Sequence, residues 1–147
     1  MVRAIFASLA LFVMAALPAT SGEVIGEVKL ARGAATIERD GQSIEAAPGL
    51  EIERLDTLRT GEGGALGLVF TDTSRVSLGP NSELKVETYV FDGQGAGDNS
   101  FDSRLTKGSM AAASGLIAKT PNAMRVLMPT TILGVRGTEF AVKVDEE

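Results

Sequence analysis

Apolar and polar residues alternate in short runs along most of this chain, and glycine-containing segments separate the runs. The clearest run is ALGLVF, in which Leu66, Leu68 and Phe70 fall on one face at a period of two. Val76 and Leu78 alternate in the same way in the next run. A period of two is that of a β-strand with one buried face, so the pattern predicts strands.

Turn signals separate these runs at roughly 8–12-residue spacing, as is typical of antiparallel all-β folds. Asp40–Gly41 is the strongest, because both residues tolerate a positive φ and apolar runs flank them. The other turns are expected at Pro48–Gly49, at GEGG (61–64), at Asp72–Thr73 and at GPNS (79–82).

The runs add up to roughly ten to twelve short strands, and no helical periodicity is present beyond residue 21. In ELKVETYVF, Leu84, Val86 and Val90 are expected on one side. No fixed repeat length holds along the chain. The sequence therefore predicts an all-β fold: a single compact antiparallel β-sandwich, or an irregular solenoid-like domain, over residues 22–147.

The segment SMAAASGLIA is ambiguous, because its alanines and methionine favour a helix. Gly108 and Gly115, however, confine any helix to under two turns. We interpret the segment as two short strands around Ser114–Gly115, preceded by a turn at Lys107–Gly108.

The N-terminus has the pattern of an export signal. A positively charged start, MVR, precedes an uncharged apolar run over residues 4–17. Pro18 follows as a helix breaker, and Ala19 and Ser21 are the small residues that signal peptidases require. We expect cleavage between Ser21 and Gly22, with cleavage after Ala19 as the alternative.

The alternative interpretation of this run is a membrane anchor. Its 14 apolar residues fall short of the roughly 20 that span a bilayer. We therefore expect residues 1–21 to be a signal peptide and the mature protein to be periplasmic or secreted, without stable insertion in the membrane. A lipoprotein anchor is excluded because the chain has no cysteine.

Composition narrows the possible chemistry. The chain has 147 residues, 44% of them hydrophobic and 22% charged, which describes one ordinary globular domain. Its formal net charge of −5 does not suit nucleic acid, whose partners carry a basic surface. It has no histidine and no cysteine, so thiolate and imidazole catalysis and the usual zinc or haem sites are excluded.

The remaining candidates for catalysis are carboxylates, lysines, hydroxyls and Tyr89. Glu51, Glu53 and Asp56 alternate with apolar residues, which is typical of a solvated strand face. No serine lies in a G-x-S-x-G elbow. We therefore predict no enzyme activity and no cofactor.

The loop DGQGAGDNSFD contains Asp92, Asp98 and Asp102 and invites comparison with a calcium loop. Calcium loops place oxygen ligands at alternate positions and close with a glutamate. Here the carboxylates are six and four residues apart and no such glutamate follows. We favour a solvated hairpin loop, and no metal site is predicted.

Several stretches, above all VSLGPNSEL (76–84) and GVRGTEF (134–140), give the chain a resemblance to the FecR domain family over about residues 24–144. The resemblance implies an all-β, typically periplasmic domain. The best-known members relay a signal from an outer-membrane receptor to a sigma factor, through a cytoplasmic segment and a transmembrane helix. Because a signal peptide is expected here instead, we expect an exported member without that cytoplasmic segment.

Two further differences from the family pattern have structural consequences. The family's D-G-[ST] turn reads Asp72–Thr73–Ser74 here, without its glycine. The chain also ends where relatives often continue with another strand. We therefore expect the final strand (137–144) to be an exposed edge, of the kind that pairs with a partner strand.

The most specific motif is the run of Gly134, Val135, Arg136, Gly137, Thr138, Glu139 and Phe140. Gly134 and Gly137 are expected to allow a bulge or bend where backbones approach closely. We interpret Arg136 as fold-fixing: its guanidinium would bind loop carbonyls and one carboxylate. The candidate carboxylates are Asp56, Asp72 and Glu139. In the alternative interpretation, Arg136 contacts a partner or an anionic ligand.

The predicted function is that of a non-enzymatic exported module that binds a protein partner or cell-envelope component, in signalling or scaffolding. The alternative is a sensor of a small ligand or carbohydrate. The chain has no tryptophan, one tyrosine and six phenylalanines, which argues against sugar binding because sugars stack on exposed aromatic rings.

Overall fold

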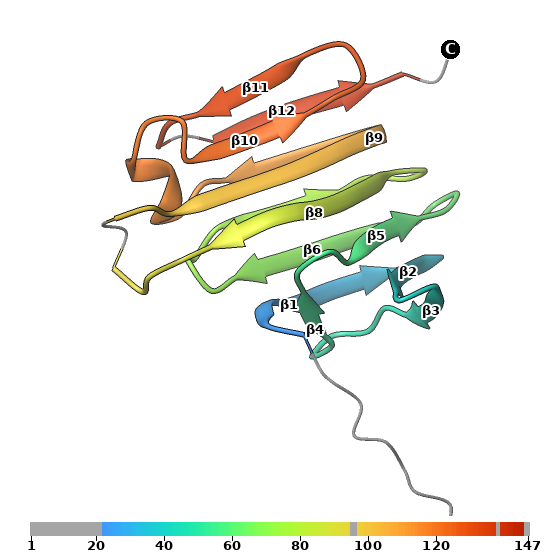
Figure 1. Ribbon diagram of the computed structural model, residues 1–147. Coiled ribbons are helices and arrows are strands. Elements are labelled where there is room, and N and C mark those ends of the chain that lie inside the picture. The colour runs from blue at the N-terminus through green and yellow to red at the C-terminus, as the bar shows by residue number, and fades with distance from the viewer. Residues whose placement is uncertain (1–21, 95–96, 138, 146–147) are drawn as a thin grey trace, which may run out of the picture.

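The computed structural model describes residues 22–94, 97–137 and 139–145, and these form an almost purely β structure of 12 strands (Figure 1). The strands are β1 (Val24–Arg32), β2 (Ala35–Arg39), β3 (Gln42–Glu45), β4 (Glu51–Glu53), β5 (Thr57–Thr60), β6 (Ala65–Phe70), β7 (Arg75–Leu78), β8 (Glu83–Val90), β9 (Ser100–Ala113), β10 (Met124–Leu127), β11 (Ile132–Val135) and β12 (Glu139–Val144). One 3₁₀ turn, η1 (Ile117–Lys119), lies between β9 and β10. The all-β prediction is confirmed.

The strands form a sheet that curls into two layers sharing one strand. One layer has the order β4-β1-β6-β7-β9-β12. The other has the order β3-β2-β5-β8-β9-β10-β11. Among the described strands, every pair is antiparallel except β9 with β10. The apolar faces of both layers meet in one core, as in a sandwich.

Strand β9 links the layers. Its first part pairs with β8 and β10, and its second part pairs with β7 and β12. The change falls at Gly108, which has a φ of +85°. A Cβ at this position would lie 2.4 Å from the Cα of Ser82, so only glycine allows this contact. The predicted turn at Lys107–Gly108 is wrong: the glycine bends one continuous strand from layer to layer.

The segment after β9 also differs from its prediction. We expected a second strand after Ser114–Gly115, but Ile117–Lys119 forms η1. Ile117 and Ala118 are fully buried there. This turn covers one side of the core without adding a strand to either layer.

The alternation seen in the sequence places the core correctly in most strands. Leu66, Leu68, Phe70, Val76 and Leu78 are all buried, as predicted. Each comes from a strand in which successive side chains point to opposite faces of the sheet. The strongest sequence pattern therefore marks the centre of the first layer.

In β8 the predicted alternation fails at its end. Val90 was expected inside but is 46% exposed, whereas Tyr89 is buried. The β8–β9 pairing shifts register between Val86 and Thr88, as at a β-bulge. An extra residue in one strand reverses which side chains face the core. The ring of Tyr89 consequently packs at 5.0 Å from that of Phe101, measured between ring centroids.

The two ends of the sandwich are open. Strands β3 and β4 end the two layers at one side, and β11 and β12 end them at the other (Figure 1). In the described structure, β12 pairs with β9 alone and β11 with β10 alone. The predicted edge position of the last strand is thus confirmed. None of the described helical turns is long and apolar enough to cross a membrane.

Candidate functional site

Arg136 lies on the surface, directly after β11. Among the described residues it forms no hydrogen bond and no ion pair. Its neighbour Val135 is buried, and alternation therefore directs Arg136 outward. The prediction that Arg136 fixes the fold from inside is wrong.

The carboxylates proposed for Arg136 are placed elsewhere. Asp56 binds Arg39, and Asp72 binds hydroxyl and backbone donors in the core. Glu139 is exposed at the start of β12. The structure thus brings together none of the pairs expected for this arginine.

The remaining residues of the GVRGTEF motif form the β11–β12 connection. Gly137 has a φ of +57°, consistent with the expected bend. Gly134 pairs regularly with Arg125, and a Cβ there would meet only the Oδ1 of Asn122, at 4.0 Å. The expected bulge at Gly134 is therefore absent. Thr138, like Ser21, lies outside the described residues.

An arginine that does fix the fold is Arg39, at the end of β2. Its Nε and Nη2 donate to the two oxygens of Asp56 at 2.9 and 2.6 Å. Its Nη1 lies 3.0 Å from Glu53 Oε1, and its Nη2 donates to the carbonyl of Glu51. The hydrogen bonds that Arg39 donates to Asp56 raise the pKa of Arg39. This cluster connects β2 of one layer with β4 of the other.

The acidic residues of this cluster were expected on a solvated face. Asp56 is instead 1% exposed and Glu53 is 9% exposed. The strand face expected for Glu51, Glu53 and Asp56 is interrupted at Leu55, which has a φ of +72° and points outward at 59% exposure. The turn reverses the alternation and carries Asp56 inside. Leucine is not a typical turn residue, so no sign of a turn at Leu55 is present in the sequence. This explains why Asp56 was expected on the solvated face.

A second buried carboxylate, Asp72, is fully enclosed between layers. It accepts hydrogen bonds from the backbone N–H and hydroxyl of Ser74, at 3.1 and 2.7 Å. It also accepts from the Tyr89 hydroxyl at 3.1 Å and from the Ile117 N–H at 3.3 Å. Burial raises the pKa of Tyr89, and the nearby Asp72 carboxylate adds to that shift. This network ties the β6–β7 turn to the segment that follows β9.

The outer face of the second layer carries cross-strand ion pairs. Arg59 on β5 pairs with Glu38 on β2 and Glu83 on β8. Further along, Arg104 pairs with Glu87. Exposed pairs of this kind contribute little individually, so the face reads as solvated surface.

Two aspartates of the loop compared with a calcium site have other partners in the structure. Asp102 binds Arg125 through both oxygens, at 2.8 and 2.6 Å. Asp92 instead accepts from the backbone of Gln94 and the side chain of Asn99. No three acidic residues within the described ranges are grouped so as to hold a metal ion.

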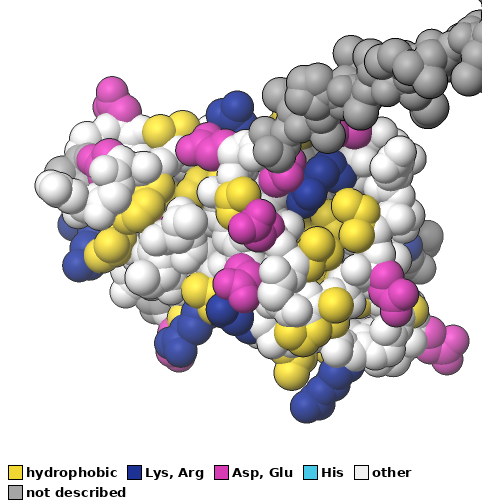
Figure 2. Space-filling view, turned by 90° about the horizontal axis from the view of Figure 1, so that it is seen from below, with side chains coloured by type: hydrophobic (Ala, Val, Ile, Leu, Met, Phe, Trp, Pro, Cys, Tyr) yellow, Lys and Arg dark blue, Asp and Glu magenta, His cyan; other side chains and the backbone are white. Residues whose placement is uncertain are grey.

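The end of the molecule formed by β1 to β4 carries a mixture of acidic, basic and apolar side chains on its surface (Figure 2). No single sign of charge dominates this face. A nucleic-acid surface needs a basic stripe, and this end does not supply one.

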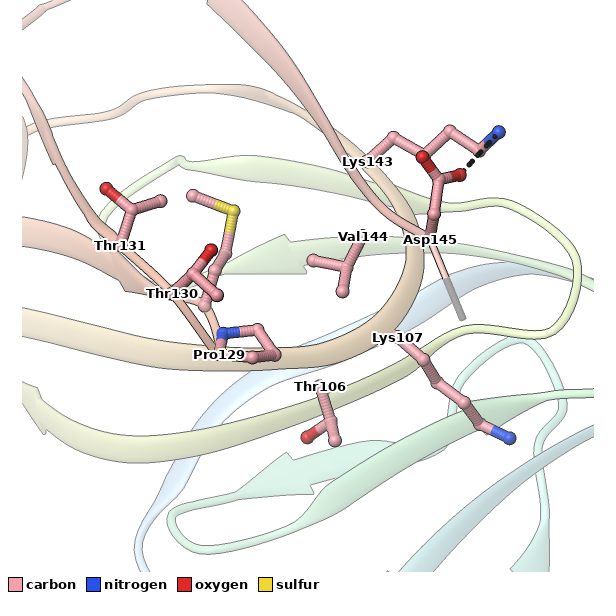
Figure 3. Close-up of a pocket in the computed structure, with 9 residues that line it drawn as sticks. Thr106, Lys107, Pro129, Thr130, Thr131, Lys143, Val144 and Asp145 are labelled. Atoms are coloured by element: carbon pink, nitrogen blue, oxygen red, sulfur yellow. Dashed lines mark ion pairs between the residues drawn. The ribbon is translucent and has the colours of Figure 1, made fainter. Parts of the chain in front are cut away.

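The end formed by β11 and β12 carries the candidate site. The inward side chains of β12, from Phe140, Val142 and Val144, are only half-buried against the core. At the end of β12 lies a pocket with a volume of about 590 Å³, formed with the loop between β10 and β11 (Figure 3). Pro129 and Val144 line it, with Thr106, Thr130 and Thr131 as polar groups.

The described residues that line this pocket include no aromatic side chain. Lys143, at its rim, pairs with Asp145 at 2.9 Å on the exposed surface (Figure 3). The pocket therefore combines apolar walls with threonine hydroxyls.

Comparison with known families identifies the family of this chain. The model of a family described as FecR protein matches residues 56–147, more than half of the chain. The chain belongs to the FecR family. This is a regulatory and signalling family associated with the cell envelope. No curated protein and no solved structure matches the chain.

The match covers β5 to β12 and leaves β1 to β4 outside, a narrower extent than the resemblance over residues 24–144. These first strands nevertheless pair with β5 and β6 in the same layers. They therefore complete the same sandwich.

Proposed function

We propose that this chain is a non-enzymatic interaction module of the cell envelope, which acts in the periplasm or outside after removal of residues 1–21. It binds a protein partner by taking up an extended segment beside β12, in signalling or scaffolding. Membership of a regulatory family supports this function, as does the export pattern of the N-terminus.

The observation that best supports the proposal is the unpaired edge of β12 in the described structure. Along one side it pairs with β9 from Glu139 to Val144. In the described structure no strand pairs with its other side. An added strand would satisfy that row of backbone groups and cover the half-buried side chains of β12.

The side chains around β12 define the chemistry of the partner segment. The outward residues Glu139, Ala141 and Lys143 present a negative, a small and a positive side chain in turn. A partner strand with basic and acidic residues at matching positions pairs best with them. The exposed guanidinium of Arg136 binds a carboxylate of the partner beside the strand. The pocket at Val144 accepts an apolar side chain of the partner.

Site-specific photocrosslinking in intact cells tests this proposal. A photoreactive residue at Ala141, exposed on β12, should give a discrete adduct with a protein partner. The same residue at Ser43, exposed on β3 at the other end, serves as the matched control. An adduct at position 141 that weakens in Arg136→Ala supports the proposal. Equal or absent crosslinking at both positions contradicts it.

A further inference from the structure

At the end of the molecule formed by β1 to β4, one contact involves Gly22, the residue expected to become the N-terminus after cleavage. The backbone nitrogen of Gly22 lies 2.9 Å from Oε2 of Glu53. The other oxygen of that carboxylate, Oε1, lies 3.0 Å from Nη1 of Arg39. Glu53 is 9% exposed, so its carboxylate is largely removed from water.

The cluster around Glu53 has an unbalanced charge. It contains two carboxylates, of Glu53 and Asp56, and one guanidinium, of Arg39, so its formal sum is one negative charge. A buried charge is costly unless it is paired. A second cation at Oε2 of Glu53 would balance the cluster, and the nitrogen of Gly22 already occupies that place.

From this geometry we infer that Glu53 is a binding site for the processed N-terminus. A signal peptidase hydrolyses the Ser21–Gly22 peptide bond: the oxygen of water joins the carbonyl carbon of Ser21, and its hydrogen joins the nitrogen of Gly22. At neutral pH the released amine takes up one further proton. The resulting α-ammonium of Gly22 then forms an ion pair with Glu53.

Glycine at this position allows the Glu53 carboxylate to approach closely. A Cβ on residue 22 would lie 2.7 Å from Oε2 of Glu53, and the carboxylate would have to move. The approach of the chain is fixed by the pairing of Val24 with Glu53 and by the hydrogen bond from the Arg54 N–H to the Glu23 carbonyl. The site is therefore assembled by β1 and β4.

Cleavage changes the strength of this contact. In the precursor, Oε2 of Glu53 accepts from one neutral amide N–H. In the mature protein it accepts from a cation, and such charge-assisted hydrogen bonds are about twice as strong. Removal of the leader thus stabilises the folded domain at the point where β1 begins.

The experiment starts from the full-length chain, exported with its own leader and purified from the envelope fraction. Mass spectrometry of the N-terminus should find Gly22. Thermal unfolding then compares the protein that has a free α-amine with its Nα-acetylated form. The acetylated protein should melt roughly 2–4 °C lower. In Glu53→Gln, acetylation should produce no such shift. The exposed Glu45→Gln variant is the matched control and should keep it.

A second readout does not depend on the variants. The pKa of the Gly22 amine, followed by nuclear magnetic resonance, should lie above its ordinary range of about 7.7–8.0. Other charged groups near the cluster include Asp40, whose charge acts on Arg39, and Arg54 and Glu23, which adjoin Glu53 and Gly22 in the chain. A mature N-terminus at Thr20, an ordinary amine pKa, or an acetylation effect that persists in Glu53→Gln overturns the inference. None of these results affects the strand-addition function proposed for β12.

Discussion

Tyr89 and Asp72 exchange two hydrogen bonds in the interior of the sandwich. The tyrosine hydroxyl accepts from the Asp72 backbone N–H at 2.9 Å and donates to the Asp72 carboxylate at 3.1 Å. The same hydroxyl lies 2.9 Å from that of Thr71. One side chain of β8 thereby holds the turn between β6 and β7.

Removal of this hydroxyl should be costly although the ring remains. Tyr89→Phe keeps the ring contacts with Phe70 and Phe101 but leaves the buried N–H of Asp72 without its acceptor. We expect a loss of about 1–3 kcal/mol in the free energy of unfolding, measured by denaturant titration. Thr71→Val, on the exposed side of the network, should cost less than about 0.5 kcal/mol. Equal stability of Tyr89→Phe and the wild type would contradict the assignment.

The same tyrosine gives a signal at alkaline pH. Its pKa is raised in the folded protein, so the folded state holds the phenolic proton more tightly than the unfolded state does. The associated stability is complete below the ordinary tyrosine pKa of about 10 and is lost as pH rises towards the folded-state value. Because the chain has one tyrosine, phenolate absorbance reports this group alone. We expect ionisation to coincide with unfolding, and Tyr89→Phe to flatten the decline; free titration near pH 10 would refute this.

Thr73 occupies a conformation that suits glycine. Its φ is +72°, a region that β-branched residues rarely adopt. Thr73→Gly should therefore raise the free energy of unfolding by about 1 kcal/mol, measured by chemical denaturation. Thr36→Gly, within β2, should instead lower it by a similar amount. Destabilisation by both substitutions would show that the turn is not strained.

Gly115 is required by a close backbone approach. A Cβ there would lie 2.2 Å from the carbonyl oxygen of Asp72 and 2.5 Å from the nitrogen of Ser74. We expect Gly115→Ala to cost at least about 3 kcal/mol and to reduce the yield of folded protein. Gly134→Ala has room for its Cβ and should fold normally. Soluble expression and thermal unfolding of the two variants provide the comparison.

Truncation of Arg39 and truncation of Arg136 should have different effects on stability. Arg39→Ala leaves Asp56 and Glu53 buried without their cation, which should cost about 3 kcal/mol. Arg136→Ala should leave the melting temperature unchanged and affect partner binding alone. Thermal unfolding of both variants decides the matter, and a large loss of stability in Arg136→Ala would restore its fold-fixing role.

The sequence predicted the fold class and most strands because period-two alternation and turn residues are local signals. The hairpin at Asp40–Gly41 follows from two residues that adopt positive φ, at +50° and +76°. The layer change at Gly108 could not be predicted, since a glycine in a strand looks the same as a glycine in a turn. The bulge that turns Tyr89 inward depends on pairing with β9, which no local pattern records.

The candidate site was predicted in part. The edge position of the last strand followed from the family resemblance, and the exposure of β12 agrees with it. The partner of Asp56 is Arg39, which lies 17 residues earlier in the chain, and no local pattern in the sequence records this contact. An apolar neighbourhood surrounds Arg136 in sequence, yet strand alternation directs its side chain to the surface.

The position of β9 in both layers limits the order in which the domain can fold. A chain that emerges N-terminus first has completed β7 and β8 before the strand that pairs with both is available. Until residues 100–113 follow, both edges stay unpaired, and the two half-sheets lack their common strand. Such long-range pairing is slow and leaves sheet edges open to aggregation. We therefore expect closure of the sandwich to be a late step of folding.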